Sequence, residues 1–134
     1  MENDEEVQKI LDRIRKDRGV VQKSREIWAR YNCKSLDLYH QMFMHVIEEQ
    51  KTIDRKTKEL IIIAIDAANL YETGLKYHFD SALRMGITPE EIFETLETAS
   101  VVCGVHVLAV ALPILQHSLE ERAPSANVGT SAGG

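Results

Sequence analysis

The residues best suited to chemistry are two carboxylates and one histidine in the middle of the chain. Glu59 and Asp66 lie seven residues apart in a strongly apolar segment, so a helix would place both side chains on one face, about two turns apart. His78 follows after a break in the pattern. A carboxylate and an imidazole that meet can transfer protons near neutral pH, which suits general acid/base catalysis.

Each of these three residues also has an ordinary structural interpretation. Glu59 would suit the solvated first turn of a helix, where a negative charge interacts favourably with the helix dipole. Asp66 lies among isoleucines and alanines, so its carboxylate must be paired, hydrogen-bonded or turned to an interface such as a subunit contact. A histidine beside an apolar stripe, as His78 is, is more often a satisfied core residue than a catalytic one.

The cysteines and the other histidines are weaker candidates. Cys103 and His106 lie three residues apart and could face one cavity, but a Cys-x-x-His pair alone is a weak metal signal. We expect Cys103 to be a buried thiol that packs as a small apolar group. Cys33 has no histidine beside it in the sequence, and we expect it to be an ordinary thiol. His40 and His45 flank a helical stripe and are expected to be surface or core residues.

Composition and charge restrict the class of protein. The 134 residues are 44% apolar and 28% charged, which suits one globular domain. A net charge of −5, without a basic cluster interleaved with aromatics, argues against nucleic acid as a partner. Two cysteines far apart make no disulfide framework, and the acidic N-terminus is unlike the basic start of a signal peptide, so we expect a cytoplasmic protein.

One segment, from Ala99 to Leu115, is apolar enough to suggest a membrane helix. It is shorter than the roughly 20 residues that such a helix needs, and it contains a glycine, a histidine and a proline. A helix that is apolar all round is otherwise buried in a core or between subunits. Since a small domain has little interior, we expect this segment to lie in an oligomer interface, not in a membrane.

Apolar periodicity predicts an all-α fold, because strand-like alternation is nearly absent. A first helix is expected to end at Gly19, a short second one to precede Asn32, and a third to run from Leu36 to Glu49. The first helix has an apolar stripe at helical spacing, formed by Val7, Ile10, Leu11 and Ile14.

Stronger signals bound the helices that follow. Asp54 is expected to cap the apolar helix, and Gly74 marks a break before a helix from Leu75 toward Met85. Threonine, proline and glutamate in the sequence Thr88-Pro89-Glu90-Glu91 predict the start of the next helix. The residues expected to be buried along it are Ile92, Phe93, Leu96, Ala99 and Cys103. We expect one domain over residues 1–122, followed by a disordered tail at 123–134.

Three motifs lie in the run DRKTKELIIIAIDAANLYETGLKYHFDSALRMGITPEEIFETLETASVVCGVHVLA. They are the Arg-Lys-Thr-Lys-Glu-Leu start of the apolar helix, the string from His78 through Ala82 to Gly-Ile-Thr-Pro-Glu-Glu-Ile, and Cys103-Gly104-Val105. This run resembles the core of the carboxymuconolactone decarboxylase superfamily, whose other branch is the alkylhydroperoxidase D type. The resemblance implies an all-α fold of about six helices around a helical hairpin, usually assembled as a trimer or a hexamer.

The resemblance argues against peroxidase chemistry. In the peroxidase branch a glutamate at the position of Glu59, a Cys-x-x-Cys pair and a histidine at the position of His78 form a thiol relay. Here the two cysteine positions are Tyr71 and Gly74. Neither residue can form a thiolate or a disulfide, so we expect dithiol-dependent peroxide reduction to be absent.

The decarboxylase branch is matched at the histidine and at Cys103-Gly104. Its acidic cluster before the histidine is represented only by Glu72, and its proline is replaced by His106. The family fold would bring Glu59 and His78 together for proton transfer on a small carboxylic acid or lactone, such as decarboxylation. We predict these two as the catalytic residues, without a cofactor or a metal. The wall of the cavity would include Tyr71, Glu72, Cys103 and His106, with Tyr71 as a phenol donor.

Two alternatives remain open. The protein could be a non-catalytic oligomeric module that keeps the fold without the cysteines. Alternatively, Glu59, His78 and His106 could bind zinc, iron or manganese, since these metals accept carboxylate and imidazole ligands.

Overall fold

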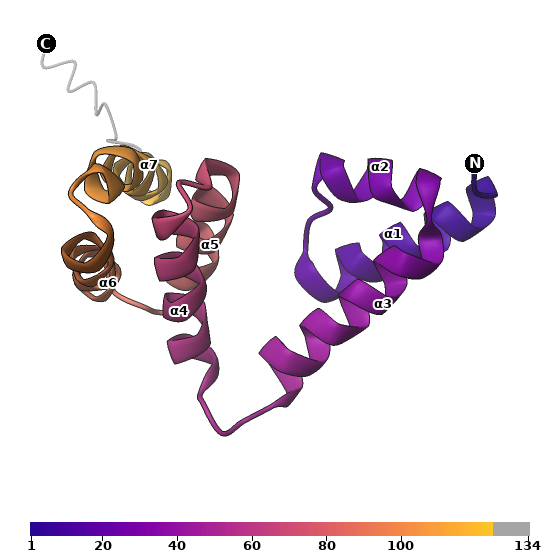
Figure 1. Cartoon of the computed structure of the whole chain (residues 1–134), viewed down its shortest axis with the longest axis horizontal. Coiled ribbons are helices and arrows are strands. Elements are labelled where there is room, and N and C mark those ends of the chain that lie inside the picture. Colours follow the sequence, from indigo (N-terminus) through magenta and orange to yellow (C-terminus); the bar gives the residue numbers. More distant parts are fainter. Residues whose placement is uncertain (125–134) are drawn as a thin grey trace, which may run out of the picture. The chain divides into compact units, whose positions relative to one another are not determined.

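The computed structural model describes residues 1–124, and these form seven α-helices and one π-helical segment, with no strand (Figure 1). The all-α prediction is confirmed. The chain forms two compact units, Met1–Ile53 and a second that begins at Asp54. The single domain expected over residues 1–122 stays a prediction, and from residue 125 on the expected tail lies outside the described residues.

The first unit contains α1 (Asp4–Arg18), α2 (Lys23–Tyr31), α3 (Cys33–Phe43) and the π-helical segment η1 (Met44–Glu49). The Asn3 side chain caps α1 by accepting the N–H of Glu5 at 2.7 Å, and Gly19 ends the helix with a left-handed φ of +81°. The predicted stripe of α1 is buried, and the core of this unit comprises Val7, Ile10, Leu11, Ile14, Ala29 and Leu36.

The predicted helix from Leu36 to Glu49 consists of two elements in the structure. The α-helical pattern stops at Phe43, and η1 continues the chain to Glu49. The N–H of Gln50 then bonds the carbonyl of His45 at 3.1 Å, an i to i−5 bond of the π type.

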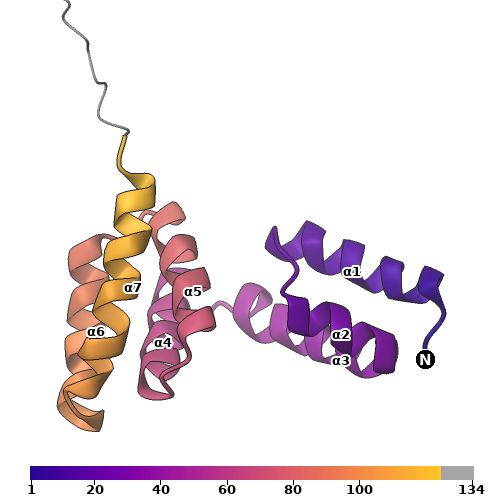
Figure 2. The same cartoon turned by 90° about the horizontal axis from the view of Figure 1, so that it is seen from above.

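The second unit contains α4 (Arg55–Ala68), α5 (Glu72–Arg84), α6 (Pro89–Cys103) and α7 (His106–Arg122). Helix α4 packs against the other three, and α7 packs against both α5 and α6, as Figure 2 shows for the neighbouring α6 and α7. The shared core comprises Ile63, Ala67, Leu75, Phe79, Ala82, Ile87, Ile92, Leu96, Ala99, Val107, Ala111 and Leu115.

The predicted starts of α4 and α6 are confirmed. The predicted start of α5 is wrong, because the helix begins at Glu72 and not at Leu75, so Gly74 lies within its first turn and does not break the chain there. The Asp54 carboxylate caps α4 by accepting the N–H of Thr57 at 2.7 Å. At α6, the Thr88 hydroxyl accepts the N–H of Glu91 at 3.1 Å, while the Glu91 carboxylate accepts the N–H of Thr88 at 2.8 Å. Pro89 occupies the first turn of α6, where no helical N–H is needed.

The predicted burial of Phe93 and Cys103 is wrong for this chain. Helix α6 turns Ile92, Leu96 and Ala99 inward, and Phe93 is one residue off this stripe, with 39% of its surface exposed. Cys103 is also exposed, since it is the last residue of α6.

The apolar segment from Ala99 to Leu115 is divided between two helices. Gly104 ends α6 with a φ of +118°, a conformation that favours glycine, and α7 begins at His106. Among residues 1–124, no helix is long and apolar enough to cross a membrane. The valines at this junction are exposed in the single chain: Val101 by 86%, Val102 by 82% and Val105 by 78%.

Candidate acid/base site

Glu59 lies on the inner face of α4. It is followed at helical spacing by Ile63 and Ala67, and all three residues have no exposed surface. The interpretation of Glu59 as part of a solvated first turn is therefore wrong: the cap at Asp54 starts α4 early enough to place Glu59 in its second turn, facing the core.

His78 lies on the inner face of α5. Its neighbours on this face include Leu75, Phe79 and Ala82, which are fully buried, while His78 is 8% exposed. The ring of Tyr77 meets the His78 ring edge to face at a centroid distance of 4.9 Å. The imidazole is therefore fixed by the core on one side and reaches the surface with only a small part of the ring.

The two inner faces join at a hydrogen-bonded ion pair. Nδ1 of His78 lies 2.6 Å from Oε1 of Glu59, and Nη1 of Arg55 donates to Oε2 of the same carboxylate, also at 2.6 Å. Each oxygen of the buried carboxylate thus has a partner, as a charge removed from water requires. The arrangement is a three-residue chain from Arg55 through Glu59 to His78.

The second ring nitrogen of His78 remains available. In residues 1–124, Nε2 has no hydrogen-bond partner, and the only completely buried side-chain nitrogen or oxygen without one is Ser118 Oγ. Nε2 therefore touches accessible space. With Nδ1 held by Glu59, Nε2 is the atom through which the ring can exchange a proton with a ligand.

Glu59 is ionised at neutral pH although it is buried. Burial raises the pKa of its carboxyl group, but the hydrogen bonds and positive charges of His78 and Arg55 together outweigh burial and hold the pKa below its ordinary value. The carboxylate beside Nδ1 fixes the orientation of the His78 ring and leaves Nε2 as its open nitrogen. This is the geometry that general acid/base catalysis requires.

Arg55 is the third residue of this hydrogen-bonded group, and its role was not predicted from the sequence. It precedes Glu59 by four residues, the spacing at which oppositely charged side chains meet on a helix. That spacing was visible in the sequence, but it gains significance only because Glu59 is buried.

The four residues predicted for the cavity wall are all exposed. Tyr71, with 47% of its surface exposed, and Glu72 lie at the start of α5. Cys103 and His106 lie at the junction of α6 and α7, where the His106 ring is folded against Gly104. The contribution of these four residues to a cavity beside His78 stays a prediction.

The metal-binding alternative finds no support in the described part of the chain. No three histidine, cysteine, aspartate or glutamate side chains among residues 1–124 are close enough to hold a metal ion. In particular, His106 does not join Glu59 and His78 as a third ligand.

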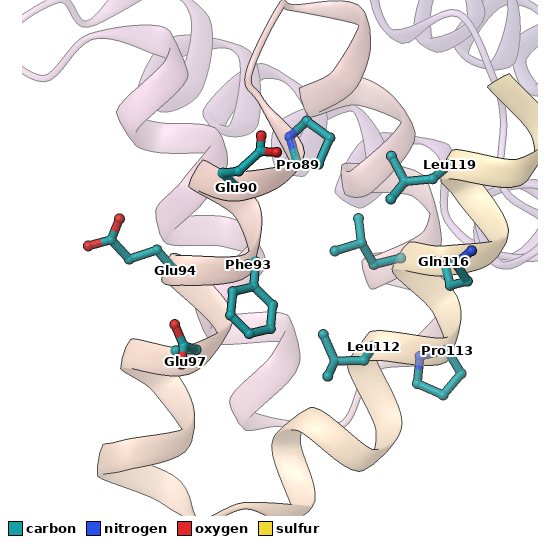
Figure 3. A pocket seen from close by; sticks show the side chains of 10 residues that line it. Pro89, Glu90, Phe93, Glu94, Glu97, Leu112, Pro113, Gln116 and Leu119 are labelled. Atoms are coloured by element: carbon teal, nitrogen blue, oxygen red, sulfur yellow. The ribbon is translucent and has the colours of Figure 1, made fainter. Parts of the chain in front are cut away.

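A groove of about 800 Å³ lies between α6 and α7 (Figure 3). Phe93 of α6 and Leu112 of α7 line its apolar part, and glutamates of α6 lie along its side. Neither Glu59 nor His78 lines it. The groove therefore contains no histidine or cysteine that could act as an acid, a base or a nucleophile.

Comparison with known proteins agrees with this architecture. The carboxymuconolactone decarboxylase family matches residues 34–117, which run from α3 to α7 and include both members of the ion pair. An uncharacterized protein of Methanocaldococcus jannaschii is 36% identical over 67 residues, which span 49% of this chain and 64% of the relative. No solved structure matches the chain. The chain belongs to the carboxymuconolactone decarboxylase family, as its motifs predicted.

Proposed function

We propose that this protein is an enzyme that transfers protons on a small carboxylic acid or lactone, with decarboxylation as the reaction that fits best. The observation that carries the proposal is the 2.6 Å contact between Glu59 Oε1 and His78 Nδ1, in a buried setting that leaves Nε2 accessible. Membership of the carboxymuconolactone decarboxylase family supports the same class of substrate.

The roles of the two residues follow from their positions. When a carboxylic acid with a carbonyl group at the β position loses CO₂, the bond to the carboxylate carbon breaks and its electron pair passes into an enolate. Protonated His78 delivers the proton on Nε2 to the enolate carbon, and solvent then restores that proton. Glu59 holds Nδ1, orients the ring and balances its charge, while Arg55 keeps the buried carboxylate ionised.

Dithiol peroxidase chemistry is disfavoured. Tyr71 and Gly74 occupy the cysteine positions of the peroxidase branch, and neither carries a thiol. Burial and the nearby charges of Glu2 and Glu6 raise the pKa of the Cys33 thiol, which makes it a poor thiolate.

The proposal includes a cytoplasmic homotrimer or homohexamer that takes a small-molecule substrate. The exposed valines at the junction of α6 and α7 and the apolar part of the groove support assembly, because monomers rarely expose a contiguous apolar surface. The alternative is a non-catalytic oligomeric module with the same fold. If the protein is an enzyme, its turnover depends on His78. A non-catalytic module shows no turnover.

The test is decarboxylation measured as CO₂ release from carboxymuconolactone and from a series of β-keto acids. We expect the wild-type protein to accelerate the loss of CO₂ from at least one of them. His78→Gln and Glu59→Gln should each lower kcat by about 100-fold or more. Glu120→Gln, which neutralises an exposed carboxylate on α7, is the matched control and should retain full activity. A wild-type rate no faster than that of buffer, or full activity in His78→Gln, would contradict the proposal.

A further inference from the structure

The Asp66 side chain lies where a side chain at position 74 would be. Gly74, in the first turn of α5, has no side chain, and a Cβ atom there would overlap Oδ2 of Asp66 and Cδ1 of Tyr71. The carboxylate at the end of α4 and the tyrosine ring therefore fill the place of a side chain at position 74. The absence of that side chain is what allows Asp66 to approach α5.

This place is next to His78. Residues 74 and 78 are four apart on α5, and side chains at that spacing are neighbours, with Cβ atoms about 5–6 Å apart. The Asp66 carboxylate thus lies one helical turn from the His78 ring, on the same face of α5. The charges of His78 and Glu59 both act on it.

The turn between α4 and α5 fixes this arrangement. The carbonyl of Asp66 accepts the N–H of Tyr71 at 2.9 Å, which folds the tyrosine back over the end of α4. Leu70 takes a φ of +52°, an uncommon conformation for a residue with a branched side chain. The Asp66 carboxylate is half-buried and accepts no hydrogen bond from another residue in 1–124. The carboxyl group therefore keeps its hydrogen-bonding capacity for a ligand.

We propose that Asp66 is a further catalytic residue of the Glu59–His78 site, a hydrogen-bond donor that contacts the substrate beside Nε2 of His78. This inference rests on the proposed function and adds a residue to it. As CO₂ leaves and the electron pair passes to the substrate's carbonyl oxygen, the protonated Asp66 donates a hydrogen bond to that oxygen and keeps its proton. His78 supplies the proton that goes to carbon. The two groups thus act on two different atoms of the substrate.

The chemistry of the Asp66 carboxyl group agrees with a donor. Burial raises its pKa; His78 lowers it and Glu59 raises it by smaller amounts, so the net pKa lies above the ordinary value of 3.8. A raised pKa keeps part of the group protonated at a pH where ordinary aspartates are fully ionised. Glu59, in contrast, is ionised, so the two carboxylates of α4 have different states and different roles.

The first test follows the Asp66 carboxyl carbon by ¹³C NMR during a pH titration of the full-length protein. The wild-type midpoint should lie above 3.8. It should rise further in His78→Gln, which loses a favourable positive charge, and fall in Glu59→Gln, which loses a negative one. Glu120→Gln is the control and should change nothing. A midpoint that responds to neither His78 nor Glu59 would overturn the inference.

A second variant covers the case in which His78→Gln or Glu59→Gln does not fold. Gly74→Ala adds the Cβ atom that displaces the carboxylate, so the Asp66 midpoint should move toward 3.8. Thr73→Ala changes an exposed residue in the same helical turn and should leave the midpoint unchanged. An unchanged midpoint in Gly74→Ala would show that Asp66 does not occupy this place.

The contact with substrate is tested with malonate, an unreactive stand-in for a β-keto acid. We expect the NMR signals of the Asp66 carboxyl carbon and of the His78 ring to shift along one saturation curve. Asp66→Ala, which removes the donor, should weaken binding at least tenfold. If only the His78 signal shifts, the inference about Asp66 is wrong while the proposed function stands. If neither signal shifts, the inference about Asp66 and the proposed function are both wrong.

Discussion

Glu59 and His78 are separated by 19 residues in the sequence, yet the carboxylate of one lies 2.6 Å from the ring of the other. The contact connects α4 to α5 beside an apolar core that includes Ile63, Leu75 and Phe79, and Arg55 binds the same carboxylate. Because the carboxylate is completely buried, the same contact that would activate the ring also determines how the two helices pack.

Removal of Glu59 should therefore destabilise the fold as well as abolish proton transfer. We expect Glu59→Ala to lower the free energy of unfolding by about 3 kcal/mol, because it leaves a cavity and removes the hydrogen-bond acceptor of the buried His78 ring and of the partly buried Arg55 guanidinium. Lys76→Ala breaks a partly exposed ion pair with Asp80 and Glu121 and should cost less than about 1 kcal/mol. Urea unfolding followed by circular dichroism measures both. Equal losses of unfolding free energy in the two variants would show that the buried Glu59–His78 pair stabilises the fold no more than the exposed ion pair does.

The pH dependence of stability should carry the signature of Glu59. Its pKa in the folded protein lies below the ordinary value of 4.5, so the unfolded chain binds the proton more readily. The stabilisation is therefore complete above about pH 4.5 and is lost as the pH falls through the lower folded-state pKa. Thermal unfolding in steps from pH 7 to pH 2 should show this loss in the wild type and a shallower one in Glu59→Gln. Identical profiles for the two proteins would contradict it.

Asp66 should behave in the opposite way. Its pKa in the folded protein is raised above 3.8, so its contribution to stability is fully present below that value and is lost as the pH rises through the folded-state pKa. Asp66→Asn cannot ionise, so it should be more stable than the wild type at pH values above the folded-state pKa of Asp66, by a small amount because the carboxyl group is only half-buried and is screened by solvent. At pH 3 the gain should vanish. A variant less stable than the wild type at pH 7 would mean that the carboxylate makes a favourable contact.

The starts of α4 and α6 were predictable because their signals are local. Asp54 before the apolar run and Thr88-Pro89 with Glu91 need only their neighbours to form caps, and the structure has both. The family motifs likewise predicted that Glu59 and His78 belong to one site. Local patterns in the sequence could not reveal that Glu59 is buried, because that depends on which face of α4 the rest of the bundle covers.

Two features of the structure could not be predicted from the sequence, because they depend on how the chain turns and how the helices pack. Asp66 was recognised as a carboxylate in need of an explanation, but its place beside Gly74 arises from a turn with an unusual φ at Leu70. The exposure of Cys103 depends on where the helix bundle ends, which periodicity along α6 does not reveal.

The exposed valines at the end of α6 predict a further measurement. Val101 and Val102 expose more than four-fifths of their surface, and Val105 adds to the same junction. Such a cluster on a protein of 15.2 kDa is expected to be covered by another copy of the chain. Light scattering coupled to size exclusion should give a mass that is three or six times that of the chain.

A single charge should disrupt this assembly if the valines are at its centre. Val102→Glu would bury a carboxylate without a partner in the interface, and the measured mass should fall toward that of one chain. Gln8→Glu adds the same charge at an exposed position of α1 and should leave the mass unchanged. A wild-type protein that is already a monomer, or a Val102→Glu variant of unchanged mass, would mean that the valines do not form the contact. The small-molecule site would then have to function within one chain.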